Sequence, residues 1–284
     1  MDINKIAGDK SRVKKPQVGM GVENAPEFSD WVEHVRNMNT AYTLETGKTR
    51  KFKIDVFGCQ MNERDSETIA GMLTNMGFEE VQKDKPADII VFVTCCVREN
   101  AEERIYGHIG ALSGECEENG SIIVTCGCMM QQPHVVEKIK KSYHNVKIVF
   151  GTHNIHTFPE LLYRYMTKRK RVFEIWEKED GVIEELPVKR ADKHKAWVNI
   201  ILGCNNFCSY CIVPYVRGRE RSRDFNDVLA EIKALAKDGC KEVTLLGQNV
   251  NSYGNDLGEK DLFARLLYAI EDIEGIERVR FMTS

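Results

Sequence analysis

The sequence predicts an α/β protein with two successive α/β units, the first built on a parallel sheet with helices on both faces. Two observations lead to this expectation. From residue 50 onward, short apolar runs that fit buried strands alternate with segments of helical periodicity, which is typical of parallel sheets covered on both sides. A charged stretch over residues 157–195 interrupts the alternation, which then resumes. A chain of 284 residues is long enough for two such units.

The first unit is expected over residues 49–156. The alternation of Phe52, Ile54 and Val56 with polar residues predicts its first strand, and Gly77 stands where a helix commonly ends. Later apolar runs indicate fully buried strands. The expected strands cover residues 52–57, 88–93, 121–125 and 146–150, and the expected helices cover 66–76, 101–112 and 135–141.

Two segments flank this unit. Residues 1–48 are interpreted as an N-terminal extension that is largely mobile. Within it, apolar side chains at helical spacing from Phe28 to Met38 predict a helix that docks on the following domain. Residues 157–195 contain one short helix and the basic run Lys168–Arg171, and we interpret them as the linker to the second unit.

The second unit is expected over residues 196–284. It shows the same alternation of apolar runs and amphipathic segments, and Gly239 again follows a helix. The expected strands cover residues 198–202, 242–246 and 278–282, and the expected helices cover 227–237 and 261–270.

The composition excludes several classes of protein. Hydrophobic residues make up 42% and charged residues 29% of the chain, and the longest apolar runs are far below the ~18 residues of a spanning helix. A net charge of −3 excludes a uniformly basic surface. Ten cysteines without a visible export signal indicate a reducing, cytoplasmic compartment, where disulfides are rare. Metal ligation, redox chemistry and ordinary buried thiols remain as interpretations.

The strongest local motif is a C-x3-C-x2-C sequence directly after an expected strand. Cys204, Cys208 and Cys211 offer three thiolates within eight residues. A 4Fe-4S cluster normally takes four thiolates, so three would leave one iron open to a small molecule. A zinc loop is the alternative, but structural zinc sites have four protein ligands, usually in paired motifs, and no second pair is nearby. The motif therefore predicts an iron–sulfur cluster.

A second, dispersed set consists of Cys59, Cys95 and Cys128. Each follows an expected strand, and they are spaced about one βα unit apart. In a parallel sheet all three lie at the carboxyl edge, where open α/β sheets bind ligands. Spacing alone also allows ordinary buried cysteines. Cys126 is an alternative to Cys128 unless the strand continues through it.

The C-x3-C-x2-C motif resembles the signature of the radical S-adenosylmethionine (SAM) enzymes, including the aromatic Tyr210 before the last cysteine. The resemblance implies a full or partial (β/α) barrel. It also implies that the open iron chelates SAM, which one-electron reduction cleaves to methionine and a 5′-deoxyadenosyl radical. Gln248 and Asn251, after the second barrel strand, are candidates for binding the SAM amine, or they form a plain turn.

The sequence segments around the dispersed cysteines resemble those of the methylthiotransferases within that superfamily. They are Phe57-Gly-Cys-Gln-Met-Asn62, Thr94-Cys95 and Gly127-Cys128-Met-Met-Gln131, and the resemblance covers about residues 50–284. It implies that Cys59, Cys95 and Cys128 hold a second 4Fe-4S cluster. Cys96 departs from the family pattern. Cys96, Cys116, Cys126 and Cys240 are given no role.

The family resemblance predicts an N-terminal open parallel α/β cluster-binding domain followed by the first part of a radical SAM (β/α) partial barrel. Only three barrel strands are expected, so we expect the chain to be a portion of a longer polypeptide. Made alone, this portion should hold the N-terminal cluster but fail to turn over SAM.

The segment Pro214-Tyr-Val-Arg-Gly-Arg-Glu-Arg-Ser-Arg223 most resembles the branch of this family that modifies isopentenyladenosine in tRNA. The implied reaction places a methylthio group on carbon-2 of an N6-isopentenyladenosine next to the anticodon. It implies as partners a tRNA anticodon stem-loop, an electron donor such as a flavodoxin or ferredoxin, and a sulfur donor, with no membrane. Threonylcarbamoyladenosine or a ribosomal-protein aspartate is the alternative substrate. A two-cluster redox protein without radical chemistry is the alternative class.

Basic side chains near the sites are candidates for binding anions. Arg217, Arg219, Arg221 and Arg223 are expected to contact the SAM carboxylate or RNA phosphates, or to form a solvated loop. Lys168–Arg171 is a weaker candidate of the same kind. His153 is interpreted as structural.

Overall fold

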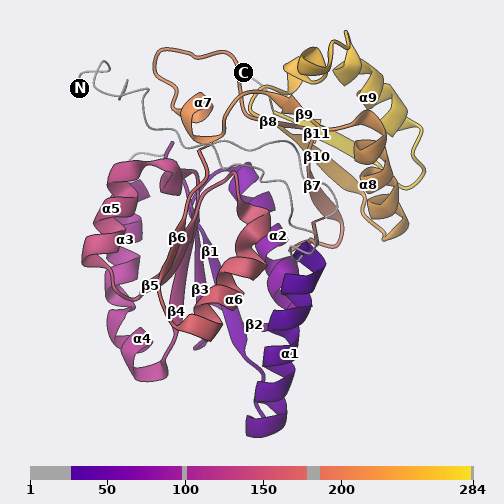
Figure 1. Cartoon of the computed structure of the whole chain (residues 1–284). Coiled ribbons are helices and arrows are strands. Elements are labelled where there is room, and N and C mark those ends of the chain that lie inside the picture. Colours follow the sequence, from indigo (N-terminus) through magenta and orange to yellow (C-terminus); the bar gives the residue numbers. More distant parts are fainter. Residues whose placement is uncertain (1–26, 98–100, 178–185, 283–284) are drawn as a thin grey trace, which may run out of the picture.

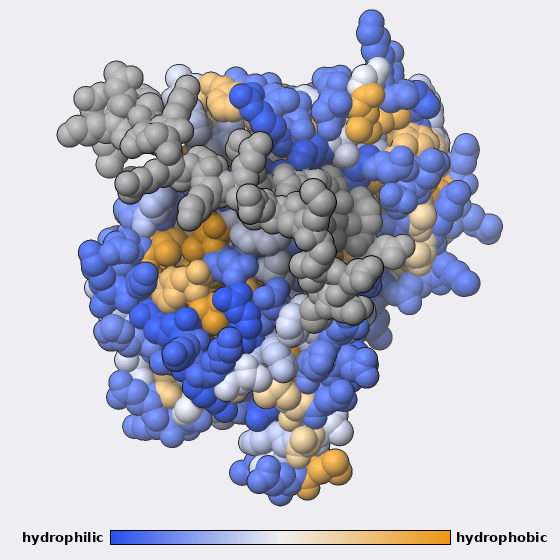
Figure 2. Space-filling view, viewed as in Figure 1, coloured by the Kyte–Doolittle hydropathy of each residue, from blue (hydrophilic) through white to orange (hydrophobic). Residues whose placement is uncertain are grey.

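A computed structural model describes residues 27–97, 101–177 and 186–282. Two α/β units follow one another along the chain and lie side by side (Figure 1). The face seen in Figure 2 is hydrophilic over most of its area, with apolar side chains gathered in separate patches. None of the helices in the described ranges is both long and apolar enough to cross a bilayer.

The first unit is built on a six-stranded sheet in the order β2-β1-β3-β4-β5-β6. Every neighbouring pair in this sheet is parallel, which confirms the prediction made from the apolar runs. The strands are β1 (Lys51–Val56), β2 (Glu79–Glu80), β3 (Ile89–Thr94), β4 (Ile122–Gly127), β5 (Val146–Phe150) and β6 (Val172–Glu174).

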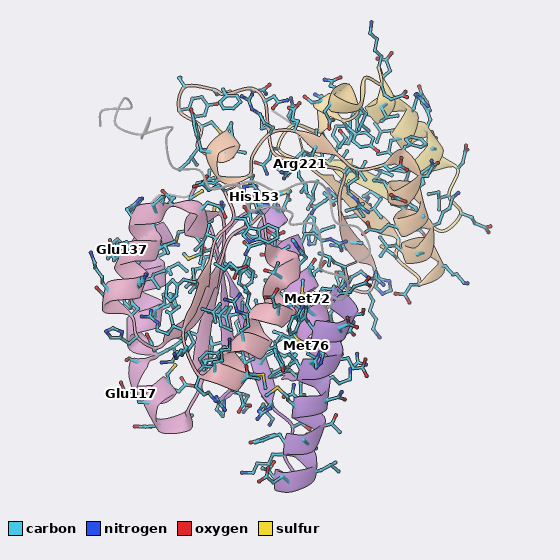
Figure 3. All side chains as sticks on the ribbon, in the orientation of Figure 1. Met72, Met76, Glu117, Glu137, His153 and Arg221 are labelled. Atoms are coloured by element: carbon cyan, nitrogen blue, oxygen red, sulfur yellow. The ribbon has the colours of Figure 1, made fainter. Side chains whose placement is uncertain are left out.

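Helices cover both faces of this sheet (Figure 1). One face packs against α1 (Phe28–Thr46), α2 (Gln60–Asn75) and α6 (Phe158–Lys168). The other packs against α3 (Ala101–Ala111), α4 (Ser113–Asn119) and α5 (Pro133–Ser142). Met72 of α2 and Met76, the residue that caps its C-terminal end, are fully buried in the first of these layers (Figure 3).

The chain reverses its winding direction between β1 and β3. The helix after β1, α2, lies on one face of the sheet, whereas α3, after β3, lies on the other. Open α/β sheets bind ligands in the crevice at the carboxyl ends of the strands where such a reversal occurs. The sheet therefore places its binding crevice beside the residues that follow Val56 and Thr94.

Two of the expected boundaries differ from the structure. The helix expected over 66–76 begins six residues earlier, at Gln60, because its polar first turns make contacts that apolar periodicity does not reveal. The sheet also continues past the domain boundary expected at residue 156, because β6 pairs with β5. β6 is only three residues long and directly follows the basic run, so its apolar signal is weak.

The expected docking of the N-terminal helix is confirmed. Val32 and Val35 of α1 are buried in the core shared with α2 and α6. Residues 28–46 are thus an integral part of the first unit, contrary to the expectation that residues 1–48 form a mobile extension. Residues 1–26 of that expected extension lie outside the described residues.

The second unit has a three-stranded parallel sheet in the order β11-β10-β7. It contains the three strands that the sequence predicts, with α8 (Phe225–Lys237) and α9 (Leu262–Glu271) packed on them. The strands are β7 (Lys195–Asn199), β10 (Glu242–Leu246) and β11 (Arg278–Phe281). An antiparallel pair, β8 (Ile201–Leu202) and β9 (Arg221–Ser222), was not expected because two-residue strands carry no periodicity.

The close approach of β3 and β4 at the carboxyl edge requires Gly127. This residue has φ of +98°, and a Cβ atom there would lie 2.4 Å from the carbonyl oxygen of Thr94. We expect Gly127→Ala to lower the free energy of unfolding by about 3 kcal/mol, at the upper end of the cost of such backbone strain. Urea denaturation followed by circular dichroism measures the change.

Gly120 is the matched control, because its φ is also positive (+68°) but no heavy atom would lie within 4 Å of an added Cβ. Gly120→Ala should cost about 1 kcal/mol, the backbone contribution alone. Equal losses for the two variants would contradict the importance of the close approach at Gly127.

Candidate functional site

The three dispersed cysteines lie at the carboxyl edge of the first sheet. Cys59 follows β1 and caps α2, Cys95 follows β3, and Cys128 opens the short 3-10 helix η2 (Cys128–Gln131) after β4. Cys95 and Cys128 are buried in one apolar cluster, and Cys59 is half-buried. The parallel sheet thus brings together residues that are far apart in sequence.

Direct contacts link the thiol of Cys128 to two neighbours. A hydrogen bond with the Cys95 thiol lowers the pKa of Cys128, whereas a hydrogen bond with Cys96 and burial raise it, to a net value of about 12. The Cys128 thiol is therefore protonated at neutral pH in the metal-free protein. A metal that binds here must displace this proton.

Cys96 is a member of this group that the sequence analysis gave no role. It is half-buried, packs against Cys95 and Cys128, and its backbone N–H lies 3.2 Å from the sulfur of Cys128. The one signal in the sequence is its adjacency to Cys95, and adjacent residues at a strand end do not normally face the same site.

Cys126 belongs to the core and not to the edge. The strand β4 continues through it to Gly127, as one reading of the sequence required. Its side chain is buried in the layer under α2, with its sulfur 3.7 Å from the carbonyl oxygen of Phe92, and burial raises its pKa. Cys116 and Cys240 are likewise buried in the apolar cores of their units.

Asn62 and Arg217 tie this edge to the second unit. The amide nitrogen of Asn62 donates to the carbonyl oxygen of Thr94 (2.9 Å), and its oxygen accepts from the Arg217 guanidinium (2.9 Å). The same guanidinium nitrogen lies 3.0 Å from a carboxylate oxygen of Asp65. One arginine of the second unit therefore holds two residues of α2.

The charges around Arg217 are complementary to it. Burial lowers the pKa of Arg217, but the Asp65 carboxylate and its hydrogen bond, together with the nearby sulfurs of Cys128 and Cys59, raise it by more, so the net pKa is above its ordinary value. The guanidinium is thus a fixed positive charge beside the dispersed cysteines. Such a charge favours thiolates and bound anionic groups at this edge.

The C-x3-C-x2-C segment forms a loop that is pinned at its base. Gly203 has φ of +74°, and an added Cβ would overlap the carbonyl oxygen of Arg219. The backbone N–H of Cys204 donates to the carbonyl oxygen of Gly218 (3.1 Å). Cys204 is buried, Cys211 is half-buried and Cys208 is exposed, so the loop opens toward solvent at its middle cysteine.

The helix α7 (Val213–Val216) brings the two sets of cysteines next to each other. It begins two residues after Cys211, and its Val216 packs against Cys95 and Cys128 together with Ile212. The hydroxyl of Thr152, at the carboxyl edge of the first sheet, donates to the carbonyl oxygen of Val216 (2.7 Å). Both cysteine sets therefore flank one short helix.

The donors in both cysteine sets are thiols, which are the ligands that iron–sulfur clusters take. Across the described ranges, no three His, Cys, Asp or Glu side chains are grouped so that they could hold one metal ion. A cube has four irons, and each takes one thiolate, so its ligands need not converge on one point. Soft thiolates without carboxylate or imidazole partners are the ligands that such clusters take.

The other predicted cofactor residues are not brought into one place by the described contacts. Tyr210 is 90% exposed, Asn251 is exposed in a short 3-10 helix, and Gln248 is half-buried after β10. An added Cβ at Gly247 would lie 2.3 Å from Ile201, so the loop that carries Gln248 packs closely on β8. Their roles toward SAM remain predictions.

The structure corrects the reading of the arginine run. Arg217 and Arg223 are buried and bound to carboxylates, so they are unavailable for RNA phosphates. Arg221 is half-buried, and only Arg219 is exposed, with its guanidinium 4.2 Å from the ring centre of Phe207. The four arginines alternate with other residues in the sequence, yet the fold places them in different environments.

Lys168–Arg171 lies far from the cysteines. The helix α6 starts near the carboxyl edge after β5 and runs back to the opposite edge, where β6 begins. Arg171 hydrogen-bonds the carbonyl oxygens of Ile139 (3.2 Å), Tyr143 (3.0 Å) and Val146 (2.8 Å), so it satisfies the end of α5. Arg171 is structural, and Lys168, Arg169 and Lys170 are exposed.

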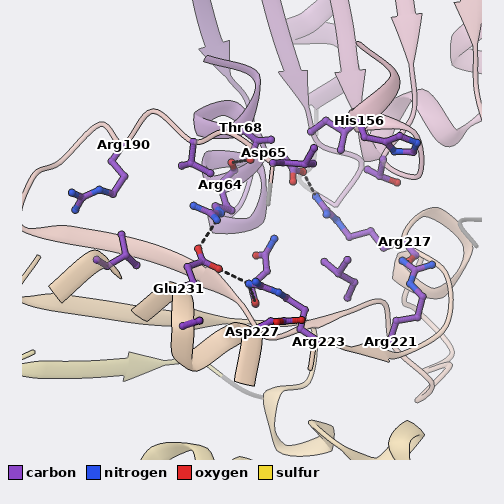
Figure 4. Close-up of a pocket in the computed structure, with 18 of the residues that line it drawn as sticks. Arg64, Asp65, Thr68, His156, Arg190, Arg217, Arg221, Arg223, Asp227 and Glu231 are labelled. Carbon is purple, nitrogen blue, oxygen red and sulfur yellow. Dashed lines mark hydrogen bonds and ion pairs between the residues drawn. The ribbon is translucent and has the colours of Figure 1, made fainter. Parts of the chain in front are cut away.

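A cavity of about 710 Å³ separates the two units. Glu231 of α8 bridges it by accepting from Arg64 of α2 (2.6 Å) and from Arg223 (2.6 Å) (Figure 4). His153 and Arg221 lie at the same junction, both close to Gly218 (Figure 3). His153 is 2% exposed, in agreement with its interpretation as a structural residue.

Comparisons with known proteins match both units. The model of "Uncharacterized protein family UPF0004" matches residues 51–151, and the model of "Radical SAM superfamily" matches residues 198–284. The chain is therefore a radical SAM protein that carries a UPF0004 domain before its radical SAM domain. Superfamily membership implies a 4Fe-4S cluster and SAM.

Curated relatives place it more narrowly. A tRNA-2-methylthio-N(6)-dimethylallyladenosine synthase of Clostridium tetani is 55% identical over 249 residues, which are 87% of this chain and 55% of that protein. One of Acetivibrio thermocellus is 49% identical over 255 residues, 89% of this chain and 53% of that protein. The chain is thus similar to radical SAM methylthiotransferases over most of its length, and it spans about half the length of the curated relatives it matches.

One solved structure has a weaker likeness. The radical SAM methyltransferase TsrM from Kitasatospora setae, with cobalamin and a 4Fe-4S cluster bound, is 13% identical. The match covers 78% of this chain and 50% of that chain, with a TM-score of 0.48.

The bridge at Arg217 is testable by stability. We expect Arg217→Gln to lower the free energy of unfolding by about 2 to 3 kcal/mol, because Asp65 would lose a charged hydrogen bond in a largely buried place. Arg219→Gln, two residues away and exposed, should change it by about 0.5 kcal/mol or less. Urea denaturation measures both values.

A double-mutant cycle with Asp65→Asn isolates the pair. The coupling free energy between Arg217 and Asp65 should be about 1 kcal/mol or more, since the two side chains are in contact. Strict additivity of the two substitutions would show that Arg217 stabilises the protein without Asp65.

Proposed function

We propose that this chain is the cofactor-binding part of a tRNA methylthiotransferase. The reaction places a methylthio group on carbon-2 of an N6-isopentenyladenosine next to the anticodon. Cys204, Cys208 and Cys211 hold one 4Fe-4S cluster, which binds SAM. Cys59, Cys95 and Cys128 hold a second cluster at the edge of the first sheet. The proposal places the reaction in the cytoplasm, where tRNA is modified.

The observation that supports this most directly is the position of α7. Val216 and Ile212 join the buried Cys95 and Cys128 in one apolar cluster, while Cys211 lies at the start of the same segment. Radical chemistry and sulfur insertion on one base require the two cofactors to share a site. A chain with two unrelated clusters would have no need to pack one cysteine loop against the other set.

When bound, the clusters and SAM supply the electron and the radical that break a carbon–hydrogen bond too unreactive for acid–base catalysis. The protein positions these groups. Val216 and Ile212 form an apolar wall between the cysteine sets. Arg217 holds a fixed positive charge beside the dispersed cysteines, and Asn62 fixes the ends of β1 and β3 against it.

The substrate and partners follow from the same proposal. Carbon-2 of a stacked base is buried, so the base must leave its stack before an enzyme can reach it. Unpaired bases of an anticodon loop can do this. An electron donor such as a flavodoxin or ferredoxin reduces the SAM-binding cluster, and a sulfur donor restores the sulfur that is transferred. Tyr210, Gln248 and Asn251 contact SAM in this proposal.

Two alternative functions can be distinguished from this one by experiment. The first is a methylthiotransferase of the same family whose substrate is another modified adenosine or a protein side chain. A two-cluster redox protein is the other class, and it releases no 5′-deoxyadenosine when SAM is added to the reduced full-length polypeptide. Release of 5′-deoxyadenosine without methylthiolated tRNA would favour the substrate alternative.

The two cysteine sets should have separate roles. We expect replacement of Cys59, Cys95 and Cys128 by Ala in the full-length polypeptide to abolish methylthio transfer while SAM cleavage continues. The physical reason is that the SAM-binding cluster depends on the other three cysteines. Chromatography of 5′-deoxyadenosine and of digested tRNA measures the two activities.

Cys116→Ala is the matched control, because Cys116 is buried in the core away from both sets, and it should keep both activities. If the triple variant cleaves no SAM although its C-terminal cluster is retained, the separation of roles is contradicted.

The corrected arginine run predicts a single RNA contact. Removing one phosphate contact changes the slope of log affinity against log salt by about 0.7 to 0.9. Arg219→Gln in the full-length polypeptide should therefore reduce the magnitude of the slope by about 0.7. Lys168→Gln should leave it unchanged, because Lys168 lies at the opposite edge of the first sheet. Equal slopes for Arg219→Gln and the unmodified protein would exclude Arg219 as a contact.

A further inference from the structure

We propose that Cys96 is a fourth protein ligand of the N-terminal cluster and closes the iron that Cys59, Cys95 and Cys128 leave open. This inference rests on the proposed function, because it presupposes a cluster at those three cysteines. The chain would then hold two unlike clusters, one open for SAM and one closed by protein until a sulfur donor arrives.

The geometry around Cys128 carries the inference. The thiols of Cys95 and Cys96 both hydrogen-bond the Cys128 thiol, and the backbone N–H of Cys96 lies 3.2 Å from the same sulfur. Cys96 also packs against the cluster of Cys95, Cys128 and Val216. Its side chain therefore lies at the ligand site, where a bound cube would meet it.

Other cysteines near the sheet do not share this position. Cys126 faces the opposite layer, with its sulfur toward the carbonyl oxygen of Phe92. Cys116 is buried between α4 and the sheet. Cys96 is thus the described cysteine outside the two proposed ligand sets that contacts a proposed ligand.

Local backbone structure explains how adjacent residues reach one site. The strand β3 ends at Thr94, and Cys95 and Cys96 lie in the bend that follows, where the alternation of side chains across a sheet no longer applies. The Cys95 sulfur lies 3.4 Å from the N–H of Val97, so the chain folds back around this thiol. The bend turns the second thiol toward Cys128.

The ligand change balances without any redox partner. The Cys96 thiol loses its proton to solvent, and its sulfur forms a bond to the open iron. An incoming sulfur donor forms its own bond to that iron as the bond to Cys96 breaks, and Cys96 takes back a proton. No electron is transferred, because a thiolate is exchanged for another sulfur ligand.

The experiment uses the 284-residue chain with both clusters reconstituted, and compares it with Cys96→Ala. A cube with an open iron loses that iron on mild oxidation with ferricyanide and becomes a 3Fe-4S cluster, which has its own electron paramagnetic resonance signal. The unmodified chain should convert only its SAM-binding cluster. Cys96→Ala should convert both, so its signal should be about twofold larger, since only the closed cube has four thiolates. Mössbauer spectra count the cubes that remain.

Cys126→Ala is the matched control and should give the signal of the unmodified chain. Equal signals from the unmodified chain and Cys96→Ala would overturn the proposal. The proposal would also be overturned if Cys96→Ala lost the whole N-terminal cluster while Cys59→Ala kept it. That result would mean that Cys96, and not Cys59, is the third ligand.

Failure of the proposed function has a different signature. If Cys204→Ala, Cys208→Ala and Cys211→Ala together leave no bound iron although Cys96 is present, no N-terminal cluster exists, and both proposals fall. If that variant binds four irons that resist ferricyanide, both stand. A circular dichroism spectrum like that of the unmodified chain establishes that the variant is folded.

Discussion

A buried arginine that crosses between two folding units is the constraint on which the site depends. Arg217 comes from the second unit, yet its guanidinium binds Asn62 and Asp65 of the first. Removing a guanidinium from water is costly unless its hydrogen bonds and charge are compensated, so this contact forms only where the partners are already in place. Asn62 is in place because it also holds the ends of β1 and β3. The sheet edge, the dispersed cysteines and the loop of the second unit are thereby fixed by one network.

A second set of charges acts on the same junction. Glu231 serves Arg64 of the first unit and Arg223 of the second, so one carboxylate balances two arginines. Arg217 and Asp65 form a further pair nearby. The junction therefore uses directional, charge-assisted bonds where a domain core would use apolar packing. Such bonds specify one relative orientation of the units, and the proposed reaction, in which two cofactors act on one base, needs one orientation.

Much of the fold was predictable because strands that are buried on both faces of a sheet have continuous apolar sequences. The runs that form β3, β4 and β5 are apolar throughout, and the parallel sheet followed from their alternation with helices. The start of α2 was not predictable from apolar periodicity. Its first turns contain the polar residues Asn62 and Asp65, which bind Arg217, about 150 residues away in the sequence. The roles within the arginine run depend on distant carboxylates in the same way. Cys96 was missed because only the bend after β3 reveals its direction.

The short length of α7 limits the changes that this segment tolerates. Only one helical turn, Val213–Val216, lies between the cysteine loop and Arg217. Each inserted residue would rotate the following side chain by about 100° around the helix axis. Loops usually tolerate insertions and deletions, yet a single one here would carry Arg217 away from Asp65 and Val216 away from the cysteines. A change in the length of this segment should therefore disturb the junction far more than an exchange of side chains at its exposed positions.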